Sequence, residues 1–258
     1  MGHSTFCFSV WRHRGLTAMH RNSPMRTQPK RSGTRLLAGK ITALEAQKKS
    51  KRRVNVYLDG AFAFGLADIV AAPLRVGQFL ADHEIAVLRH RDAAERCYEM
   101  ALRFLSYRPR SRAELARHLA TRQVPKDLIA HTLERLADSG LLDDGAFAHF
   151  WVENRESFRP RSSAALRYEL RRKGVDEDVI DDAVRGINEE DSAYQAAQTL
   201  APRLAHVDRD TFRRRLGGYL RRRGYSYETA RATVDRLWRE RVPSNNAGGE
   251  HPSAGSRR

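Results

Sequence analysis

Apolar residues recur with two different periods along this chain. Between residues 40 and 66 they alternate with polar residues, which is typical of β-strands with one buried face. From residue 82 onward they recur three and four positions apart, which is typical of amphipathic helices. The pattern therefore predicts a small β-rich segment followed by a longer helical segment.

The alternating segment carries a hairpin signal at Asp59-Gly60. An Asp-Gly pair between two alternating runs favours a two-residue turn, because both turn positions need a positive φ. The pairs predicted across this turn are Tyr57 with Phe62 and Asn55 with Phe64. An isolated hairpin is barely stable in water, so we expect a third strand near 41–45 and a helix near 67–72. Together these elements would form a small cap.

The helical segment contains an internal repeat. The stretch Ser106–Ser111 returns 51 residues later as Ser157–Ser162, and the apolar positions stay aligned beyond it without a gap. A third, more diverged copy follows, in which Arg221–Tyr225 matches Arg171–Val175. Self-similarity at a fixed period of this size is typical of stacked helical units that bury their apolar faces against one another.

These patterns predict a mainly α fold: an elongated array of three tandem three-helix repeats behind a small N-terminal β-hairpin or three-stranded cap. Proline and glycine mark the helix breaks, and Gly174 is expected in a left-handed conformation at a helix C-terminus. The first helix of the third repeat is expected over 189–205, and Gly217-Gly218 lies inside its second helix. The predicted domains are a disordered basic tail at 1–38, the cap at 39–81, repeats at 82–142, 143–188 and 189–240, and a disordered tail at 241–258.

Charge and cysteine content narrow the class of protein. The formal net charge is +16, which favours polyanionic partners. Cys7 and Cys97 are too few and too far apart for a disulfide framework or a zinc site, so a reducing compartment is expected. No run approaches the roughly 18 apolar residues that span a bilayer. We expect a cytoplasmic protein without a membrane segment, for which Met19 and Met25 are alternative starts to Met1.

Enzyme signatures are missing from the sequence. It lacks a Walker loop, a nucleophile elbow and a His-Glu-x-x-His helix. Asp143-Asp144 invites a catalytic or metal interpretation, but an aspartate just before a helix also caps its free amides. We favour the cap, with Phe147 packing inward, and expect no catalytic, cofactor-binding or metal-binding residue.

Basic residues at helix ends and beside the repeated prolines are the candidate binding residues. Guanidinium groups suit phosphate or carboxylate, and the sequence leaves open whether the partner is nucleic acid or acidic protein loops. A helix-end arginine also complements the helix dipole, so each has a structural explanation. Basic residues recur at equivalent positions of the repeats although core packing gives no evident reason for them, which favours a role in binding. The candidates are Arg108, Arg110, Arg159, Arg161, Arg167, Arg171, Arg172, Lys173, Arg213, Arg214, Arg221, Arg222 and Arg223.

Four tyrosines lie near these basic helices: Tyr168, Tyr219, Tyr225 and Tyr227. Packing in the core or at its rim is the favoured interpretation for each of them, because amphipathic aromatic residues commonly fill such junctions. Stacking on unpaired bases is the alternative.

Several of these segments resemble the RecX family, regulators of the RecA recombinase. The similar motifs are Gly140–Asp144 with Phe147-Ala148, Val152 and Arg155, then Glu169–Val175, and the hairpin Val54–Gly65. The resemblance covers roughly Ile41 to Arg239. It implies tandem three-helix units that bind along the groove of a RecA–single-stranded-DNA filament and inhibit the recombinase.

On this resemblance we expect a non-enzymatic, monomeric regulator of homologous recombination and the SOS response. Its partners would be the RecA filament and single-stranded DNA within that filament. The alternative is a stand-alone basic helical protein that binds single-stranded DNA or RNA. Such a protein would bind nucleic acid tightly without RecA, and its affinity would fall steeply with salt.

Overall fold

The computed structural model describes residues 38–48 and 50–241, so the predicted tails lie almost wholly outside the described residues. The N-terminal part is a small antiparallel sheet with the strand order β3-β2-β1-β4. A short β4 adds a fourth strand to the predicted cap. The strands are β1 (Gly39–Gln47), β2 (Ser50–Leu58), β3 (Ala61–Ala67) and β4 (Phe79–Leu80).

The predicted hairpin turn is confirmed, with Asp59 at φ 48° and Gly60 at φ 83°. Tyr57 pairs with Phe62 as predicted, but the predicted Asn55–Phe64 pair is wrong. A bulge interrupts the register between Val56 and Tyr57, with Ala63 as the extra residue in β3, so that Phe64 pairs with Val56 instead. An extra residue in one strand changes which side chains share a face, and here it brings Phe64 onto the buried face with Val56.

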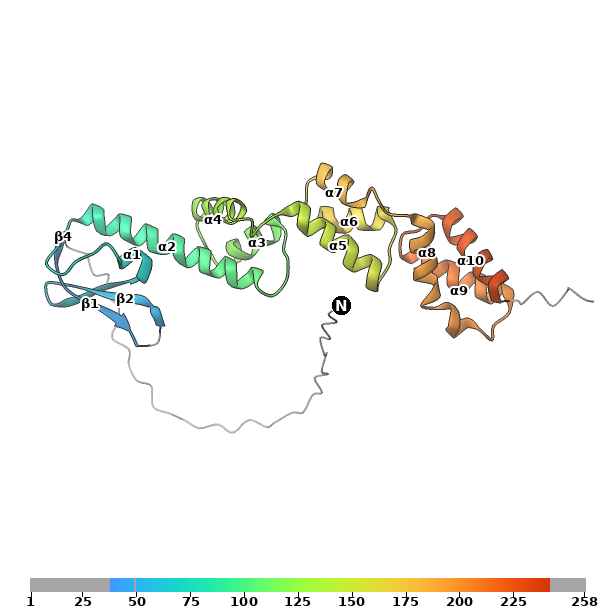
Figure 1. Cartoon of the computed structure of the whole chain (residues 1–258), viewed down its shortest axis with the longest axis horizontal. Helices are drawn as coiled ribbons and strands as arrows, with labels where there is room; N and C mark the ends of the chain where they lie inside the picture. The colour runs from blue at the N-terminus through green and yellow to red at the C-terminus, as the bar shows by residue number, and fades with distance from the viewer. Residues whose placement is uncertain (1–37, 49, 242–258) are drawn as a thin grey trace, which may run out of the picture. The chain divides into compact units, whose positions relative to one another are not determined.

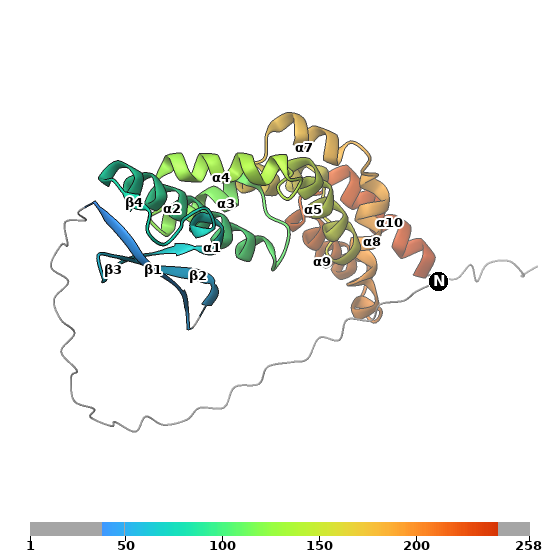
Figure 2. The same ribbon diagram turned by 60° about the vertical axis from the view of Figure 1, so that its left-hand side comes forward.

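A buried carboxylate ties this sheet to the long helix that follows. Helix α1 (Asp68–Ala71) is short, whereas α2 (Asp82–Leu105) extends from the sheet to α3 and α4 (Figure 2). Asp92 on α2 accepts a hydrogen bond from Ala67 N at 2.7 Å and forms ion pairs with Arg53 at 3.2 Å and Arg96 at 3.1 Å. A buried charge is tolerated when it is paired in this way.

The helices from α2 onward form three groups (Figure 1), and each group packs around its own buried apolar cluster. The first group is α2 with α3 and α4, the second is α5 to α7, and the third is α8 to α10. No described helix is long and apolar enough to cross a membrane. The helices are α3 (Arg112–Thr121), α4 (Lys126–Asp138), α5 (Asp144–Phe158), α6 (Ser163–Lys173), α7 (Glu177–Val184), α8 (Glu189–Gln198), α9 (Arg209–Arg222) and α10 (Tyr227–Arg241).

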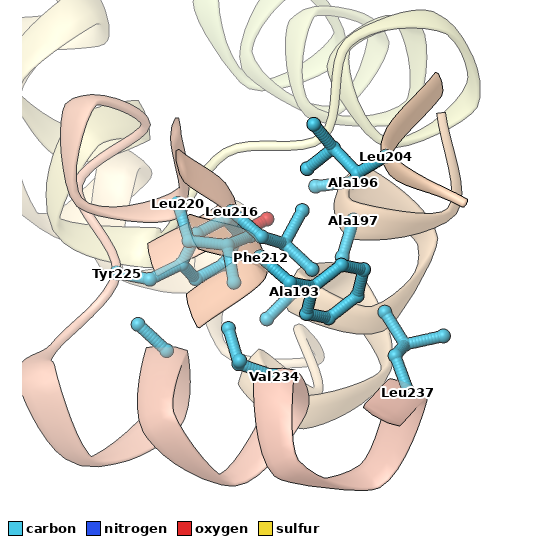
Figure 3. Close-up of a cluster of buried hydrophobic side chains, with 11 residues drawn as sticks. Ala193, Ala196, Ala197, Leu204, Phe212, Leu216, Leu220, Tyr225, Val234 and Leu237 are labelled. Carbon is cyan, nitrogen blue, oxygen red and sulfur yellow. The ribbon is translucent and has the colours of Figure 1, made fainter. Parts of the chain in front are cut away.

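The prediction of one helix over 189–205 is wrong. Helix α8 ends at Gln198, and a 3-10 helix, η1, follows at Ala201–Leu204. Pro202 explains the break, because a proline has no N–H to donate and its ring clashes with the carbonyl four residues earlier. Beyond the break, Phe212 of α9 packs among the small alanines of α8 and the apolar face of α10 (Figure 3).

One helix ending recurs in all three groups. In each group a residue just beyond the middle helix has a positive φ. These residues are Gln123 at 59°, Gly174 at 80° and Gly224 at 95°. The left-handed conformation predicted at Gly174 is therefore confirmed, and it suits glycine because a side chain is penalised there. In each case the N–H of the next residue donates a hydrogen bond to a leucine carbonyl within the helix: Val124 to Leu119, Val175 to Leu170 and Tyr225 to Leu220.

Candidate partner-binding surfaces

Ser111, the last residue of the repeated stretch, forms hydrogen bonds both with its own helix and with the next group. Ser111 is the N-cap of α3: its Oγ accepts from Glu114 N at 3.1 Å and donates to the Lys173 carbonyl at 2.7 Å. Gly174 lies against the same helix, where an added Cβ would be 2.4 Å from the Cβ of Ala113. We call this contact between α3 and the end of α6 the first junction.

The same arrangement returns between α6 and the end of α9, which we call the second junction. Ser162 caps α6 by accepting from Ala165 N at 3.1 Å, and its own N–H donates to the Arg223 carbonyl at 3.2 Å. The Arg223 side chain donates to the Pro160 carbonyl at 2.8 Å. A Cβ at Gly224 would lie 2.5 Å from Ser162 Oγ, so this glycine is also required by close packing.

Glu114 neutralises two of the candidate basic residues at the first junction. Its carboxylate accepts from Lys173 Nζ at 2.6 Å and from Arg108 Nη2 at 3.1 Å. Burial alone would raise the pKa of Glu114, but the hydrogen bonds and charges of Arg108 and Lys173 outweigh burial and lower the pKa to about 2. The charges of Arg108 and Lys173 are therefore engaged inside the protein.

Two further candidates are paired along the contact of α6 with α7, which we call the α6–α7 seam. Arg167 forms an ion pair with Asp181, and Arg171 donates to Glu177 at 2.7 and 2.5 Å. The hydrogen bond with Glu177 raises the pKa of Arg171, and the same bond lowers the pKa of Glu177. Both acids come from α7, the helix that follows.

A polar pocket of about 490 Å³ opens beside the first junction. Glu169 at its wall accepts from the Trp151 indole at 2.8 Å and from Arg155 at 2.8 Å, and it pairs with Arg161 at 3.1 Å. Arg172 lines the same pocket, is exposed and stacks over Tyr168, with no described acidic side chain within 4 Å.

The basic residues of α9 differ from those of α6. Arg213, Arg214, Arg221 and Arg222 are exposed, and among the described residues none of them forms an ion pair. Three of them line a groove of about 330 Å³ between α9 and α10, whose other walls include Gly217-Gly218 and Tyr227. We call this the α9–α10 groove.

The two remaining candidates lie at the turns that carry the repeated prolines. Arg110 is partly buried and stacks over the Phe104 ring at 4.1 Å. Burial, together with the nearby charge of Arg108, lowers the pKa of Arg110. Arg159 is exposed just after α5. The thirteen candidates are thus divided among two junctions, one seam, one pocket, one groove and the two proline turns, with Arg222 on α9 outside the groove lining, rather than gathered into one cluster.

Comparison with known proteins places this arrangement in a family. Three family models match the chain: the RecX N-terminal domain at residues 39–80, the first RecX three-helix domain at 97–136 and the second at 143–184. Regulatory protein RecX of Bacillus subtilis is 31% identical over 202 residues, which cover 76% of this chain and 76% of that protein. The chain belongs to the RecX family.

Other RecX proteins agree with this assignment. Regulatory protein RecX of Mycobacterium avium is 42% identical over 140 residues, which cover 53% of this chain and 81% of that protein. A crystal structure of a regulatory protein RecX matches with a TM-score of 0.63 and 29% identity, covering 77% of this chain and all of that chain. The two RecX three-helix domains correspond to the first two helix groups.

The structure corrects one interpretation of the basic residues in this RecX protein. The statement that the basic helix ends recur without a core reason is wrong for Lys173 and Arg223, because each stabilises a junction. Asp143 does cap α5, accepting from Gly145 N at 2.7 Å, and Phe147 is buried as predicted. Asp144 instead accepts from the Arg112 N–H of the first group at 2.7 Å.

The tyrosines divide in the same way as the basic residues. Tyr225 is buried and its hydroxyl lies 2.7 Å from Ser192 Oγ, so the packing interpretation holds for it. Tyr168 and Tyr227 are 61% and 59% exposed, so neither ring is part of the core, and Arg172 lies over the Tyr168 ring. The acidic partners Glu114 and Glu169 were missed, and the only sequence signal for Glu114 was its position three residues after a capping serine.

Proposed function

We propose that this protein is a non-enzymatic regulator that binds the RecA–single-stranded-DNA filament and inhibits or modulates the recombinase, including its ATPase and strand exchange. The observation that carries the proposal is membership of a family whose relatives are named regulatory proteins. Exposed basic side chains without internal partners support it, because a filament presents both phosphates and acidic protein surface. The role would belong to homologous recombination and the SOS response.

We propose that the partner is contacted by the exposed candidates that form no ion pair among the described residues: Arg159, Arg172, Arg213, Arg214, Arg221 and Arg222. The other candidates make their contacts at the junctions, at the seam or on neighbouring rings. Affinity spread over several modest sites multiplies when the sites lie on one chain. Single substitutions should therefore weaken binding less than combined ones.

We propose further that α8–α10 is a third copy of the three-helix unit. The recurring helix ending at Gly224 and the second junction support this, because both reproduce features of the preceding copy. We also propose that the protein acts as a monomer in the cytoplasm.

The proposal is tested by titrating the full chain into RecA ATPase and strand-exchange reactions, with binding to free single-stranded DNA measured at the same salt. The expected result is inhibition at concentrations that leave most free DNA unbound. Inhibition that appears only when the DNA itself is saturated would favour the stand-alone nucleic-acid-binding protein. No inhibition at any concentration would reject the proposal.

A further inference from the structure

The α9–α10 groove occupies the position of the α6–α7 seam, 50 residues further along the chain. The two sites carry different residues at the equivalent positions that form the ion pairs of the seam. Arg167 of the seam is replaced by Gly217, and its acidic partners are replaced by Tyr227 and Arg231. Arg171 is matched by Arg221, which has lost its acid. A seam closed by ion pairs has thus become an open, positively charged groove.

The two glycines in α9 have no packing role in the fold. An added Cβ at Gly217 would meet nothing within 4 Å, and one at Gly218 would meet only the flexible end of Arg222 at 3.4 Å. Glycine is among the poorest helix formers, because it has most backbone freedom to lose. Gly174 and Gly224 are different, since both have positive φ and are tightly packed. The α9 glycines expose helical backbone at the groove instead.

Groups suited to a nucleotide surround this exposed backbone. Arg213, Gly217 and Arg221 follow one another at four-residue intervals, so the two arginines lie about 12 Å apart along one helix face. Tyr227 is the first residue of α10, and its exposed ring lies where the positive end of that helix dipole favours an anion. Asp235, 3.8 Å from Arg231, is the nearest described acid paired with a groove residue.

We propose that the α9–α10 groove binds single-stranded DNA. Arg213, Arg214 and Arg221 contact phosphates, a base stacks on Tyr227, and the glycines let the strand approach the helix closely. An acidic peptide would use the arginines but would gain little from an aromatic face beside them. The inference deepens the proposed function and rests on it, because it assigns to this groove the contact with DNA held in the filament.

The experiment measures fluorescence anisotropy of a labelled oligo-dT strand with the full chain, without RecA. Gly217→Met fills the groove with a better helix former, and Gly186→Met makes the same substitution at an open position outside the groove. G217M should bind at least tenfold more weakly with an unchanged or higher melting temperature, whereas G186M should bind like the wild type. Equal binding by G217M and the wild type would overturn the proposal.

One further outcome tests the identity of the ligand, and two others separate this inference from the proposed function. A labelled oligoglutamate peptide that binds the wild type better than oligo-dT, and is lost in G217M, would assign the groove to an acidic protein segment and overturn the DNA assignment. If the wild type inhibits RecA while G217M keeps full DNA binding, the assignment of DNA binding to the groove is rejected and the proposed function is kept. If G217M loses DNA binding but the wild type never inhibits RecA, the assignment to the groove is kept and the proposed function is rejected.

Discussion

The α6–α7 seam and the α9–α10 groove lie between the last two helices of their respective groups and differ in whether their arginines have acidic partners. In the seam, Arg167 and Arg171 face the carboxylates of α7. In the groove, Arg213 and Arg221 have no described acidic partner, and a tyrosine lies at the position of Glu177. Whether the arginines of one helix are paired therefore depends on the residues of the helix that follows.

This difference explains why a repeat can keep its basic residues while changing their role. Exposed ion pairs contribute only about 0–1 kcal/mol each, so the seam loses little stability when its acids are exchanged. A paired arginine must give up its internal acid before it contacts a phosphate, whereas an unpaired one need not. Divergence of the third group thus changes the surface chemistry without changing the Leu166, Leu170 and Leu216, Leu220 core positions.

The largest effect is expected when the seam's acids are transplanted into the groove. The variant Y227E/R231D should lower affinity for oligo-dT about thirtyfold, which corresponds to about 2 kcal/mol. The new carboxylates would pair with Arg221 and repel phosphate, and the stacking ring would be lost. Anisotropy at fixed salt measures the change.

The matched control is A232E/R239D, which changes the net charge by the same amount at exposed positions of α10 outside the groove lining. It should weaken binding less than threefold. An equal loss in both variants would mean that total charge, and not the groove, governs binding.

The next effect concerns stability at the first junction. Glu114→Gln removes the acid that holds Lys173 and Arg108, and we expect a loss of about 1–2 kcal/mol in the free energy of unfolding, because two partly buried cations lose their partner. Urea denaturation of both proteins at pH 7 measures it. Unchanged stability would mean that Lys173 is not needed for the junction and is available to a partner.

The same carboxylate predicts a dependence on pH. The folded pKa of Glu114 is lowered to about 2 from the ordinary value of 4.5, so its stabilisation is complete above pH 4.5 and is lost as the pH falls toward 2. The stability difference between wild type and E114Q should therefore shrink across that range. A difference that stayed constant from pH 5 to the lowest pH at which both proteins fold would contradict this assignment.

Most features that the sequence predicted depend on neighbours within a few residues. The cap at Asp143 and the left-handed Gly174 are local in this sense. Pro202 was a local signal for the end of α8, but the helical spacing of apolar residues continued past it and led to the prediction of one longer helix. The bulge in β3 was not predictable, because it depends on which face of the hairpin is buried by the rest of the fold.

Whether each basic residue has an acidic partner depends on how the helices pack, and local sequence reasoning did not predict it. Lys173 and Glu114 are 59 residues apart in sequence and meet only because two helix groups dock. Trp151, Arg155 and Arg161 converge on Glu169 because α5, the turn after it and α6 pack together within the second group. The sequence identified which residues are basic and recurrent, but only the folded contacts, within and between groups, separate those with acidic partners from those without.

The smallest effect should come from unpairing the seam. E177Q/D181N releases Arg167 and Arg171, and we expect little loss of stability, because these ion pairs are exposed. Affinity for oligo-dT should rise less than threefold, since the seam still lacks an aromatic ring at the position of Tyr227. A larger gain would show that unpaired arginines alone are enough to make a binding surface.

The salt dependence of DNA binding tests the central distinction most directly. For single strands, log affinity falls with log salt by about 0.7 per phosphate contact. The slope for R213A/R214A/R221A should therefore be smaller than the wild-type slope by about 2, while that for R161A/R167A/R171A should stay within about 0.3 of the wild type. Equal reductions in the two triple variants would contradict the account, because internally paired and unpaired arginines would then contact DNA alike.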